Sequence, residues 1–415
     1  MIKSFAMKKS KAEARPRVVV IGAGAMGSIT VRDLVETAPP EFEIVVADFN
    51  EKAAKALAKS FKRKVEGVFV NATDVNGTAK VLSGAFAVIT AVQHQFNLFI
   101  MQAALKAGAH YCDLGGLFHY TRKQLKLHNQ FKKAGLTAVL GIGAAPGVVN
   151  VLARSAADTM EKVYEVHVKV GNIDRTVGRP SNPLGTSYSI QTILEEATTP
   201  AALFTNGKFT FVEAMSGSEE THYPAPVGVR RPHYTIHSEV ATLPLSYKSK
   251  GIRECSFRIA FGDELEDRLR FVRALGLTSE KPLKVGRGKD AVNVVPRQVL
   301  FAMLAQQPKL SWNGKPDEYE ILRVVVRGIR KGVAVEETVD CHTPGIPAWN
   351  MGVDVDTGCP PSIAVQMMYR GEISERGVLP PEVAIPADPF FRELAKRRMT
   401  VKREVRTLGA ARKSA

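Results

Sequence analysis

Cysteine is scarce in this chain of 415 residues, which contains four, at positions 112, 255, 341 and 359. They form no CxxC pair and no zinc-binding motif with histidine, so we expect reduced, buried thiols and no metal site. Long apolar runs are also missing, since no stretch approaches the roughly 18 consecutive apolar residues of a membrane helix. The first residues, MIKSFAMKKSKAEARP, lack the apolar centre of a signal peptide, so we expect a cytoplasmic protein with no membrane partner.

Three catalytic motifs are absent as well. The sequence has no HExxH, no serine nucleophile elbow and no Walker lysine, so metalloprotease, α/β-hydrolase and phosphoryl-transfer chemistry have no support. The net charge of +16 is concentrated at the ends: residues 1–17 carry +5 and residues 392–415 carry +7, which leaves +4 for the rest. We therefore expect a basic flexible tail over 1–16, a second basic tail over 392–415, and no specific binding of nucleic acid.

The first part of the body alternates between strand-like and helix-like segments. Six short apolar runs, rich in β-branched residues, are separated by segments with helical spacing, such as EKAAKALAKSF and NLFIMQAALKAG. Such alternation predicts right-handed βαβ crossovers and a parallel sheet covered on both faces. Residues 17–150 are therefore predicted to form an α/β doubly wound domain of the Rossmann type.

The pattern of apolar and polar residues changes after residue 150. Later strands alternate between apolar and polar residues, as in ECSFRIAF, and EILRVVVRGIRKGVAVEETV is typical of a hairpin with its turn at Arg330–Gly332. Residues 151–341 are predicted to form a second, α+β domain with a mixed or antiparallel sheet. Residues 342–391 read as a long loop, HTPGIPAWNMGVDVDTGCPP, followed by a helix, SIAVQMMYRG, that returns to the first domain.

The sharpest local motif is a glycine-rich turn between the first strand and the first helix. Gly22 permits the tight turn, Gly24 allows close approach of a pyrophosphate, and Gly27 allows the helix to pack on the strand. The helix expected over Ser28–Glu36 attracts the anion with its N-terminus, and Ala25 and Met26 of the turn are further cofactor-binding candidates. We predict a dinucleotide site here.

Polar residues at the ends of the next strands extend this predicted site. Asp48 closes the second strand, where a carboxylate binds the adenosine ribose, so NAD is favoured; NADP stays open because Lys52 and Lys55 are near. Asp74 follows the third strand and is either an adenine contact or a helix N-cap. After the fourth strand, Gln95 and Asn97 are candidates for the nicotinamide end, with a polar helix start as the alternative.

Four elements together carry a family resemblance: GAGAMG at 22–27, HQFN at 94–97, HYCDLGG at 110–116 and GIGAAPGVVNVLA at 141–153. With them, the chain resembles the saccharopine dehydrogenase-like family from Arg17 to about Pro386, and within it most closely the L-lysine 6-dehydrogenases. The resemblance implies a Rossmann domain, a middle domain for substrate binding and dimer contacts, and hydride exchange at a carbon that bears nitrogen. One departure concerns the substrate, because Gly141 stands where those dehydrogenases carry an acidic residue.

Amine dehydrogenation needs a carboxylate and a titratable base beside the nicotinamide. Asp113, at the end of the fifth strand, is a candidate partner of the substrate ammonium, or a turn residue. His237 is a candidate general base with a pKa near neutrality, and Glu239 lies two residues on, which in a strand places both on one face. The proposed substrate-binding residues, each with a structural alternative, are Gly115, Gly116, His119, Tyr120, Arg230 and Arg231.

The sequence therefore predicts a homodimeric NAD(P)-dependent oxidoreductase that acts at the C–N bond of an amino acid such as lysine, or of a saccharopine-type adduct. Two alternatives stay open. One is a dehydrogenase of another amine or polyamine derivative, and the other is a catalytically inactive NAD(H)-binding regulator.

Overall fold

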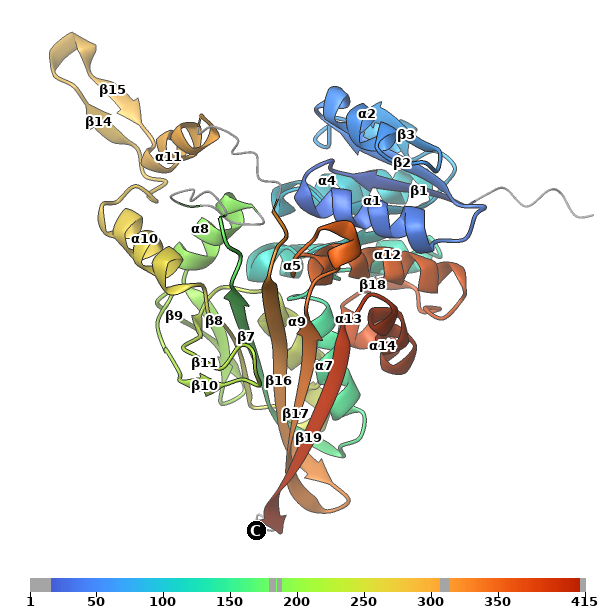
Figure 1. Cartoon of the computed structure of the whole chain (residues 1–415), viewed down its shortest axis with the longest axis vertical. Coiled ribbons are helices and arrows are strands. Elements are labelled where there is room, and N and C mark those ends of the chain that lie inside the picture. The colour runs from blue at the N-terminus through green and yellow to red at the C-terminus, as the bar shows by residue number, and fades with distance from the viewer. Residues whose placement is uncertain (1–15, 179–183, 185–188, 307–313, 411–415) are drawn as a thin grey trace, which may run out of the picture.

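The structure is a computed structural model that describes residues 16–178, 184, 189–306 and 314–410 (Figure 1). The basic tail expected over 1–16 lies, apart from Pro16, outside the described residues. The described chain forms two large sheets with helices around them, one on each side of a shared interface.

The N-terminal sheet contains seven parallel strands, namely β1 (Arg17–Ile21), β2 (Glu43–Asp48), β3 (Val65–Phe69), β4 (Ala85–Thr90), β5 (His110–Asp113), β6 (Thr137–Val139) and β18 (Gly377–Leu379). Their order is β18-β6-β5-β4-β1-β2-β3, so the direction of winding reverses between β1 and β4. Both faces are covered: in β1, Val18 and Val20 face one core, whereas Val19 and Ile21 face the other. The predicted doubly wound fold is confirmed, and the sheet contains a seventh strand, β18, that the sequence did not indicate.

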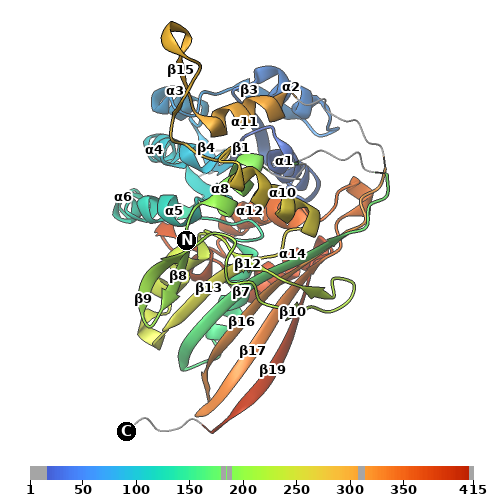
Figure 2. The ribbon, with the colours of Figure 1, turned by 90° about the vertical axis from the view of Figure 1, so that its left-hand side faces the viewer.

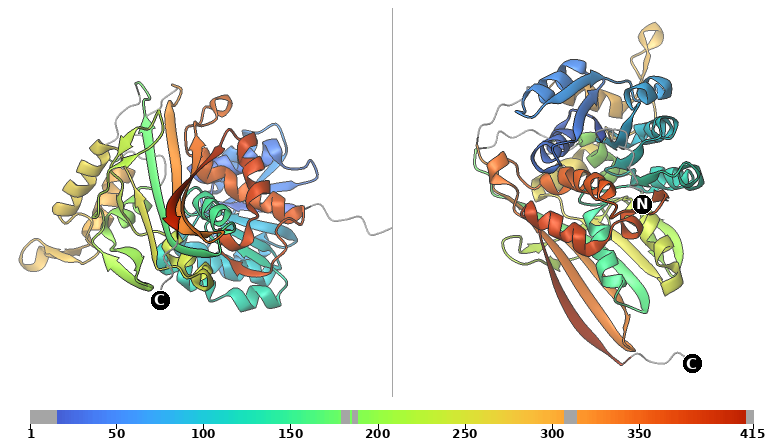
Figure 3. Two further views of the ribbon diagram at one scale, coloured as in Figure 1. Left: turned by 90° about the horizontal axis from the view of Figure 1, so that it is seen from below. Right: turned by 90° about the vertical axis from the view of Figure 1, so that its right-hand side faces the viewer.

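Helices cover both faces of this sheet. They are α1 (Ala25–Thr37), α2 (Glu51–Lys59), α3 (Val75–Val81), η1 (His94–Phe96), α4 (Asn97–Ala107), α5 (Leu117–Leu125), α6 (His128–Lys133) and α12 (Val355–Tyr369). Helix α1 packs against α12 on one face, while α3 packs against α4 on the other. The two views of Figure 3 show α12, in red, beside the blue α1, although more than 300 residues separate them in the chain.

The second sheet is mixed and contains β7 (Lys162–Asp174), β8 (Ala201–Thr205), β9 (Lys208–Val212), β12 (His233–Tyr234), β13 (Glu254–Ile259), β16 (Glu318–Arg330), β17 (Val333–Thr343) and β19 (Thr400–Ala410). The order is β19-β17-β16-β7-β13-β8-β9, with β12 paired to β13. Only β7 and β13 among these pairs run parallel. In β7, Val166, Val168 and Val170 are buried while His167 and Lys169 face the other side, which confirms the predicted alternation.

Most of the remaining elements lie around this sheet, while the hairpin over residues 283–294 projects away from it (Figure 1 and Figure 2). They are α7 (Val148–Ala157), α8 (Ile190–Thr198), β10 (Thr221–His222), β11 (Val229–Arg230), α9 (Glu239–Ser246), η2 (Lys248–Lys250), α10 (Asp263–Ala274), β14 (Leu283–Val285), η3 (Gly288–Asp290), β15 (Val292–Val294), α11 (Pro296–Ala305), η4 (Pro347–Trp349), α13 (Pro381–Ala384) and α14 (Ala387–Lys396). Helices α7 and α9 pack on one face of the sheet, and α8 packs with α10. The predicted hairpin is confirmed, since β16 ends at Arg330 and β17 begins at Val333.

The last part of the chain differs from the expectation. The basic segment 392–415 was expected to be a tail, but its described part completes α14 and forms β19, which pairs with β17 along its length. Charge misled the prediction because edge strands are rich in charged residues, which protect them against unwanted pairing.

The expected loop over 342–361 also ends early, because α12 begins at Val355 and contains Pro360 and Pro361. Two prolines remove backbone donors from the helix, so it depends on packing. Gly358 provides that packing: a Cβ there would lie 2.5 Å from Ile29 Cβ, and the Thr30 hydroxyl of α1 donates to the Gly358 carbonyl at 2.7 Å. Tertiary contact with α1 therefore outweighs the local signal for a loop.

Candidate active site

A cavity of about 760 Å³ lies between the two domains. The glycine-rich turn after β1 and the ends of β2 and β4 line one side of it, and α8, β7, β13 and β16 line the other. The first turn of α12 closes it. The cavity thus lies at the carboxyl edge of the parallel sheet, next to the point where the winding reverses, which is where doubly wound folds bind dinucleotides.

The glycine-rich turn has the shape that a pyrophosphate requires. Gly22 has a φ of +116°, and a Cβ on Gly27 would lie 1.9 Å from the Gly22 carbonyl oxygen, so the close packing of α1 on β1 depends on both glycines. At Gly24, by contrast, a Cβ would meet no atom within 4 Å, so this backbone is open toward the cavity. Ala25 and Met26 begin α1 and also line the cavity, so its N-terminal dipole points at the space. These residues fit a dinucleotide.

Asp48 lies at the end of β2 and lines the same cavity. Its Oδ2 accepts a hydrogen bond from the Ala23 amide at 2.7 Å, and its Oδ1 accepts one from the Asn50 amide at 2.7 Å. The carboxylate is therefore fixed beside the glycine-rich turn, with lone pairs left for a ribose diol.

Replacing Asp48 with alanine is expected to weaken NAD binding and to shift preference toward NADP. The loss of one or two hydrogen bonds to a charged acceptor corresponds to about 1.5 to 3 kcal/mol each. Fluorescence titration with NADH and NADPH in parallel measures the change. The control is Glu51→Ala, which changes an exposed acid on α2. An unaltered NADH affinity in the Asp48 variant would show that Asp48 does not bind the ribose.

Three of the strand-end residues expected at the cofactor, Asp74, Gln95 and Asn97, do not line the cavity. Asp74 caps α3, with its Oδ1 accepting from the Gly77 amide at 2.9 Å, which agrees with the N-cap alternative. Gln95 is exposed on η1, whereas its neighbours Gln93 and His94 line the cavity. The tight turn of η1 points these side chains in different directions, and the sequence does not reveal which one faces inward.

Asp113 lies beneath the cavity rather than in it. Its side chain is 1% exposed and accepts hydrogen bonds from the amides of Gly141 (2.6 Å) and Gly115 (2.9 Å). The side chains of Asn97, Tyr111 and Gln124 donate to it as well. Burial raises the pKa of Asp113, and the donors act in the opposite direction. The expected contact with a substrate ammonium does not fit, because these partners occupy the carboxylate.

Asp113 and Asn97 instead hold the loops that shape the cavity. The Asn97 amide donates to the Gly115 carbonyl at 3.0 Å, and Gly115 lines the cavity. Gly141 has a φ of +63°, and a Cβ there would lie 2.6 Å from Pro146 Cγ. This explains why glycine, rather than an acidic residue, occupies position 141 in this chain.

His237 and Glu239 lie together, although not in a strand. β12 ends at Tyr234 and α9 begins at Glu239, so the expected strand over TIHSEV is wrong and a turn brings the two side chains together. His237 Nδ1 lies 2.6 Å from Glu239 Oε2, and its Nε2 lies 3.6 Å from Glu196 Oε1 on α8. The imidazole stacks on Phe257 with ring centroids 3.7 Å apart. All three polar side chains are buried, and His237 and Glu196 line the cavity.

The charge of His237 differs from the expectation. Burial disfavours the imidazolium, but Glu239 and Glu196 outweigh burial and raise the pKa of His237 to about 10. The side chain is therefore protonated at neutral pH and is suited to donate a proton, not to accept one. The expected pKa near neutrality is wrong because Glu196, from a distant segment, was not part of the prediction.

His94 is a site residue that was not predicted from the sequence. It lines the cavity at the end of β4, and its Nε2 lies 3.5 Å from Glu195 Oε2. Burial lowers the pKa of His94, despite the opposing influence of Glu195 and Asp113. The cavity thus contains two histidines with oppositely shifted pKa values, one suited to donate a proton and one suited to accept it.

The other residues expected at the substrate lie outside the cavity. Gly116 is buried behind it, with its amide 3.4 Å from Ser238 Oγ. On α5, His119 is exposed and stacks on Phe211, while Tyr120 packs edge-on against His94. None of the three lines the cavity.

Arg230 and Arg231 also lie away from the cavity. Arg230 Nε donates to the Asn172 carbonyl at 2.8 Å, and Arg231 pairs with Glu220 at 2.7 Å. The two arginines therefore do not form the expected carboxylate clamp. Their partners on β7 and beside β10 already engage them.

Three acidic residues at the end of the cavity nearest α12 were missed. Glu320 comes from β16, and Asp354 and Asp356 come from the start of α12. The two acids in the sequence GVDVDTG could have indicated Asp354 and Asp356, because acidic residues collect at helix N-termini. Glu320 gave no comparable signal, because it is one of two glutamates at the start of a strand with alternating residues.

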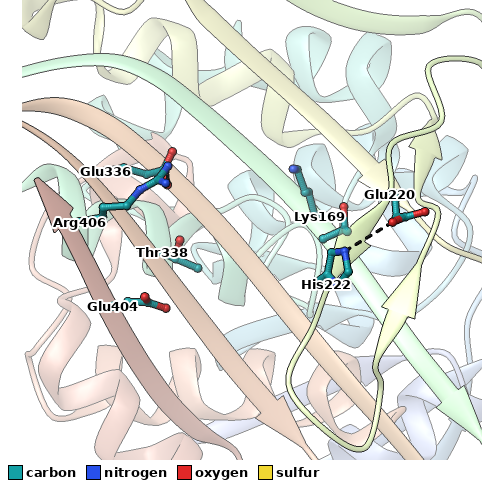
Figure 4. A pocket seen from close by; sticks show the side chains of 8 residues that line it. Lys169, Glu220, His222, Glu336, Thr338, Glu404 and Arg406 are labelled. Carbon is teal, nitrogen blue, oxygen red and sulfur yellow. Dashed lines mark hydrogen bonds and ion pairs between the residues drawn. The ribbon is translucent and has the colours of Figure 1, made fainter. Parts of the chain in front are cut away.

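A second hollow, of about 550 Å³, lies on the polar face of the mixed sheet (Figure 4). Most of its charges are paired: Arg406 donates to Glu336 at 2.8 Å, and Lys169 lies 2.6 Å from Glu219, which lies beside the hollow. His222 lies 3.5 Å from Glu220. Because these charges are mutually neutralised and no predicted site residue lines this hollow, the cavity between the domains is the better candidate.

Neither a metal centre nor a membrane-spanning helix is found in the described part of the chain. No group of three or more His, Cys, Asp or Glu side chains there is arranged to hold a metal ion. None of the helices described there is long and apolar enough to cross a membrane.

Comparison with known families covers both domains. The family model described as the saccharopine dehydrogenase NADP binding domain matches residues 18–139, and the saccharopine dehydrogenase C-terminal domain matches residues 143–399.

Characterised relatives span nearly the whole chain. Carboxyaminopropylagmatine dehydrogenase of Synechocystis sp. is 24% identical over 92% of this chain and 95% of its own length. Carboxynorspermidine synthase of Vibrio cholerae is 26% identical over 90% of this chain and 93% of its own length.

Two solved structures share the fold. Saccharopine dehydrogenase (L-Glu forming) from Saccharomyces cerevisiae has a TM-score of 0.70 at 18% identity and covers 94% of this chain and 100% of its own. Homospermidine synthase from Legionella pneumophila, in complex with NAD, has a TM-score of 0.66 at 13% identity and covers 95% and 91%. The chain belongs to the saccharopine dehydrogenase family and is an NAD(P)-dependent oxidoreductase that acts on C–N groups.

Proposed function

We propose that this protein exchanges hydride between a nicotinamide cofactor and the C–N carbon of a secondary amine in a carboxylated, polyamine-like molecule. The observation that carries the proposal is the charge of the cavity. Five carboxylates line it, those of Asp48, Glu196, Glu320, Asp354 and Asp356, and the described lining residues include no lysine or arginine. Asp48 lies at the cofactor end, so the other four surround the substrate space, where they complement a cation with several charges.

The relatives support this substrate class over lysine. Both carboxynorspermidine and carboxyaminopropylagmatine are, by name, carboxylated derivatives of cationic amines. A saccharopine-type adduct carries several carboxylates, for which the described lining offers no arginine or lysine partner. The expectation of an L-lysine 6-dehydrogenase therefore gives way to the polyamine alternative.

The two histidines provide the proton chemistry. When bound, the nicotinamide supplies or accepts the hydride. In the reducing direction, the imine carbon gains the hydride while the nitrogen gains a proton, and His237, protonated between Glu196 and Glu239, is placed to give it. In the oxidising direction the same transfer runs in reverse, so His237 takes the proton back, and neutral His94, which also lines the cavity, can accept a hydrogen bond from the substrate ammonium. The flanking carboxylates stabilise the positive charge on the reacting nitrogen in both directions.

Incubation with NAD and NADP and a panel of carboxylated polyamines, lysine and saccharopine tests the proposal. We expect an increase in reduced-nicotinamide absorbance with at least one carboxylated polyamine and a much smaller one with lysine or saccharopine. Turnover of lysine alone would overturn the proposed substrate class. Tight NADH binding without turnover of any amine would instead favour the inactive regulator.

We also propose that the protein is a homodimer, as the family resemblance implies. Exposed apolar side chains on β19, those of Val405 and Leu408, support this, because exposed apolar surface favours contact with a second copy. Analytical ultracentrifugation measures the mass directly, and a single species with the 45.2 kDa mass of one chain would contradict the proposal.

A further inference from the structure

The far end of the cavity contains two carboxyl groups that the proton chemistry does not use. Glu320 projects from β16, and Asp356 lies in the first turn of α12. Both line the cavity. Asp356 is 2% exposed and its carboxyl group contacts that of Glu320, so when both groups are ionised its buried Oδ2 has no hydrogen-bond donor among the described residues. An unsatisfied carboxylate oxygen that is buried against a cavity is costly unless a ligand donates to it.

The two groups are held in place by their surroundings. Glu318, on the same face of β16, accepts a hydrogen bond from the Val353 amide at 3.1 Å and so ties the start of α12 to the strand. Gly352 makes this contact possible, because a Cβ there would lie 1.7 Å from Glu318 Oε2. Burial raises the pKa of Glu320 to about 7, with Asp354 and Glu318 acting in the same direction and a hydrogen bond with Asp356 acting against it; burial together with Glu320 raises the pKa of Asp356 well above its usual range. A cation between them would relieve this strain on their ionised forms.

The floor between this pair and His237 is apolar. Val170 on β7, Ile259 on β13 and Leu322 on β16 line it, and register pairing places them side by side in the sheet. Phe257, on which His237 stacks, pairs with Val168 of β7, whereas Glu320 pairs with Asn172 of the same strand. Glu320 therefore lies two strands away from Phe257 and four residues further along the sheet. With about 4.8 Å between strands and about 3.3 Å per residue, the two Cα positions are roughly 16 Å apart.

We propose that Glu320 and Asp356 form a subsite for the terminal ammonium group of a diamine or polyamine, whose methylenes lie on the apolar floor while its reacting nitrogen lies near His237. The inference rests on the proposed function and adds to it. A substrate with a second ammonium group at the right distance from the reacting nitrogen contacts Glu320 and Asp356. An amine of the same length that lacks the second ammonium group does not make this contact. The subsite would therefore select substrates by the distance between the reacting nitrogen and the terminal cation.

Isothermal titration calorimetry of the full chain with 1,8-diaminooctane and with n-octylamine tests the subsite without requiring turnover. The two amines match in length, are long enough to reach from His237 to the acidic pair, and differ in the distal ammonium. We expect the diamine to bind the unmodified protein about tenfold to a hundredfold more tightly than octylamine, as for a charge-assisted contact. Glu320→Gln and Asp356→Asn are each expected to remove most of this difference, whereas Glu404→Gln, which removes an exposed acid on β19, keeps it.

Three results would overturn the subsite. The first is equal binding of the two amines by the unmodified protein, and the second is an undiminished preference for the diamine in both variants. The third is a loss of NADH affinity in Glu320→Gln, which would show that Glu320 contacts the cofactor instead. Thermal unfolding of each variant shows whether it is folded, and Glu320→Gln keeps the test decisive where Asp356→Asn fails to fold. Because calorimetry needs no catalysis, a failed turnover assay with a retained preference for the diamine would overturn the proposed function alone.

Discussion

Replacement of His237 with alanine is expected to lower turnover by about a hundredfold to ten-thousandfold while leaving NADH affinity nearly unchanged. This range is typical for the loss of a positioned proton donor. His237 is the residue between Glu239 and Glu196 that lines the cavity, and its raised pKa keeps it protonated at neutral pH. Steady-state kinetics in the reducing direction and NADH fluorescence titration measure the two quantities separately.

The pH profile distinguishes this role from a structural one. With a pKa of about 10, His237 loses its proton as the pH rises through that value, so the reducing rate of the unmodified protein should fall there. The alanine variant should lack this decline. The charged form of His237 also contributes to the free energy of unfolding. This contribution is fully present at a pH below the unfolded-state pKa of about 6.5, and it is lost as the pH rises through about 10.

His233→Ala is the matched control for His237. His233 is also buried beside a glutamate, 3.3 Å from Glu266, but it does not line the cavity. We expect this variant to lose some stability and to keep the turnover and the pH profile. Equal losses of turnover in both variants, or an unchanged alkaline decline in His237→Ala, would assign His237 to structure.

Replacement of Arg397 with methionine should destabilise the protein by about 3 to 5 kcal/mol, the usual cost of leaving a buried charge unpaired. Arg397 is 3% exposed and forms two parallel hydrogen bonds to Asp33 of α1, at 2.7 and 2.8 Å. It also donates to Thr37 and to Glu393. The change removes the positive charge and leaves Asp33, which is fully buried, without its main partner. The midpoint of urea unfolding measures the effect.

Two further variants define the cause of this loss. Arg392→Met removes an arginine from the exposed face of α14, the helix that ends next to Arg397, and should change stability by less than about 0.5 kcal/mol. The double variant Asp33→Leu/Arg397→Met replaces both charges with apolar groups and should recover most of the stability. A single Arg397 variant as stable as the unmodified protein would show that the pair contributes little.

The sequence predicted those parts of the fold that local patterns determine. The strand β1, the glycine-rich turn and the start of α1 adjoin in the chain, so periodicity and turn chemistry were sufficient. The same holds for the hairpin of β16 and β17. β19 and the first turns of α12 were missed because their structure depends on partners far away in the chain, namely β17 and α1.

The residues of the candidate site also divide into those that local sequence patterns place and those that distant contacts place. Gly22, Gly24 and Asp48 lie at strand ends, where the topology of the sheet places them, and all three line the cavity. Glu196 and Glu320 reach the cavity from two other elements, and neither has a sequence neighbour that signals chemistry. Their position follows from how the mixed sheet and α8 meet the first domain, which spacing along the chain does not contain.

The return of the chain to its first domain has a consequence for biosynthesis. A ribosome that has released residues 17–150 has produced six of the seven parallel strands, but neither the edge strand β18 nor α12, which covers α1. The free edge of β6 and the uncovered apolar face of α1 therefore stay exposed while more than 200 further residues are translated. Domains usually fold as units in the order of their synthesis, whereas here the dinucleotide-binding half is completed only after most of the second half has been synthesised.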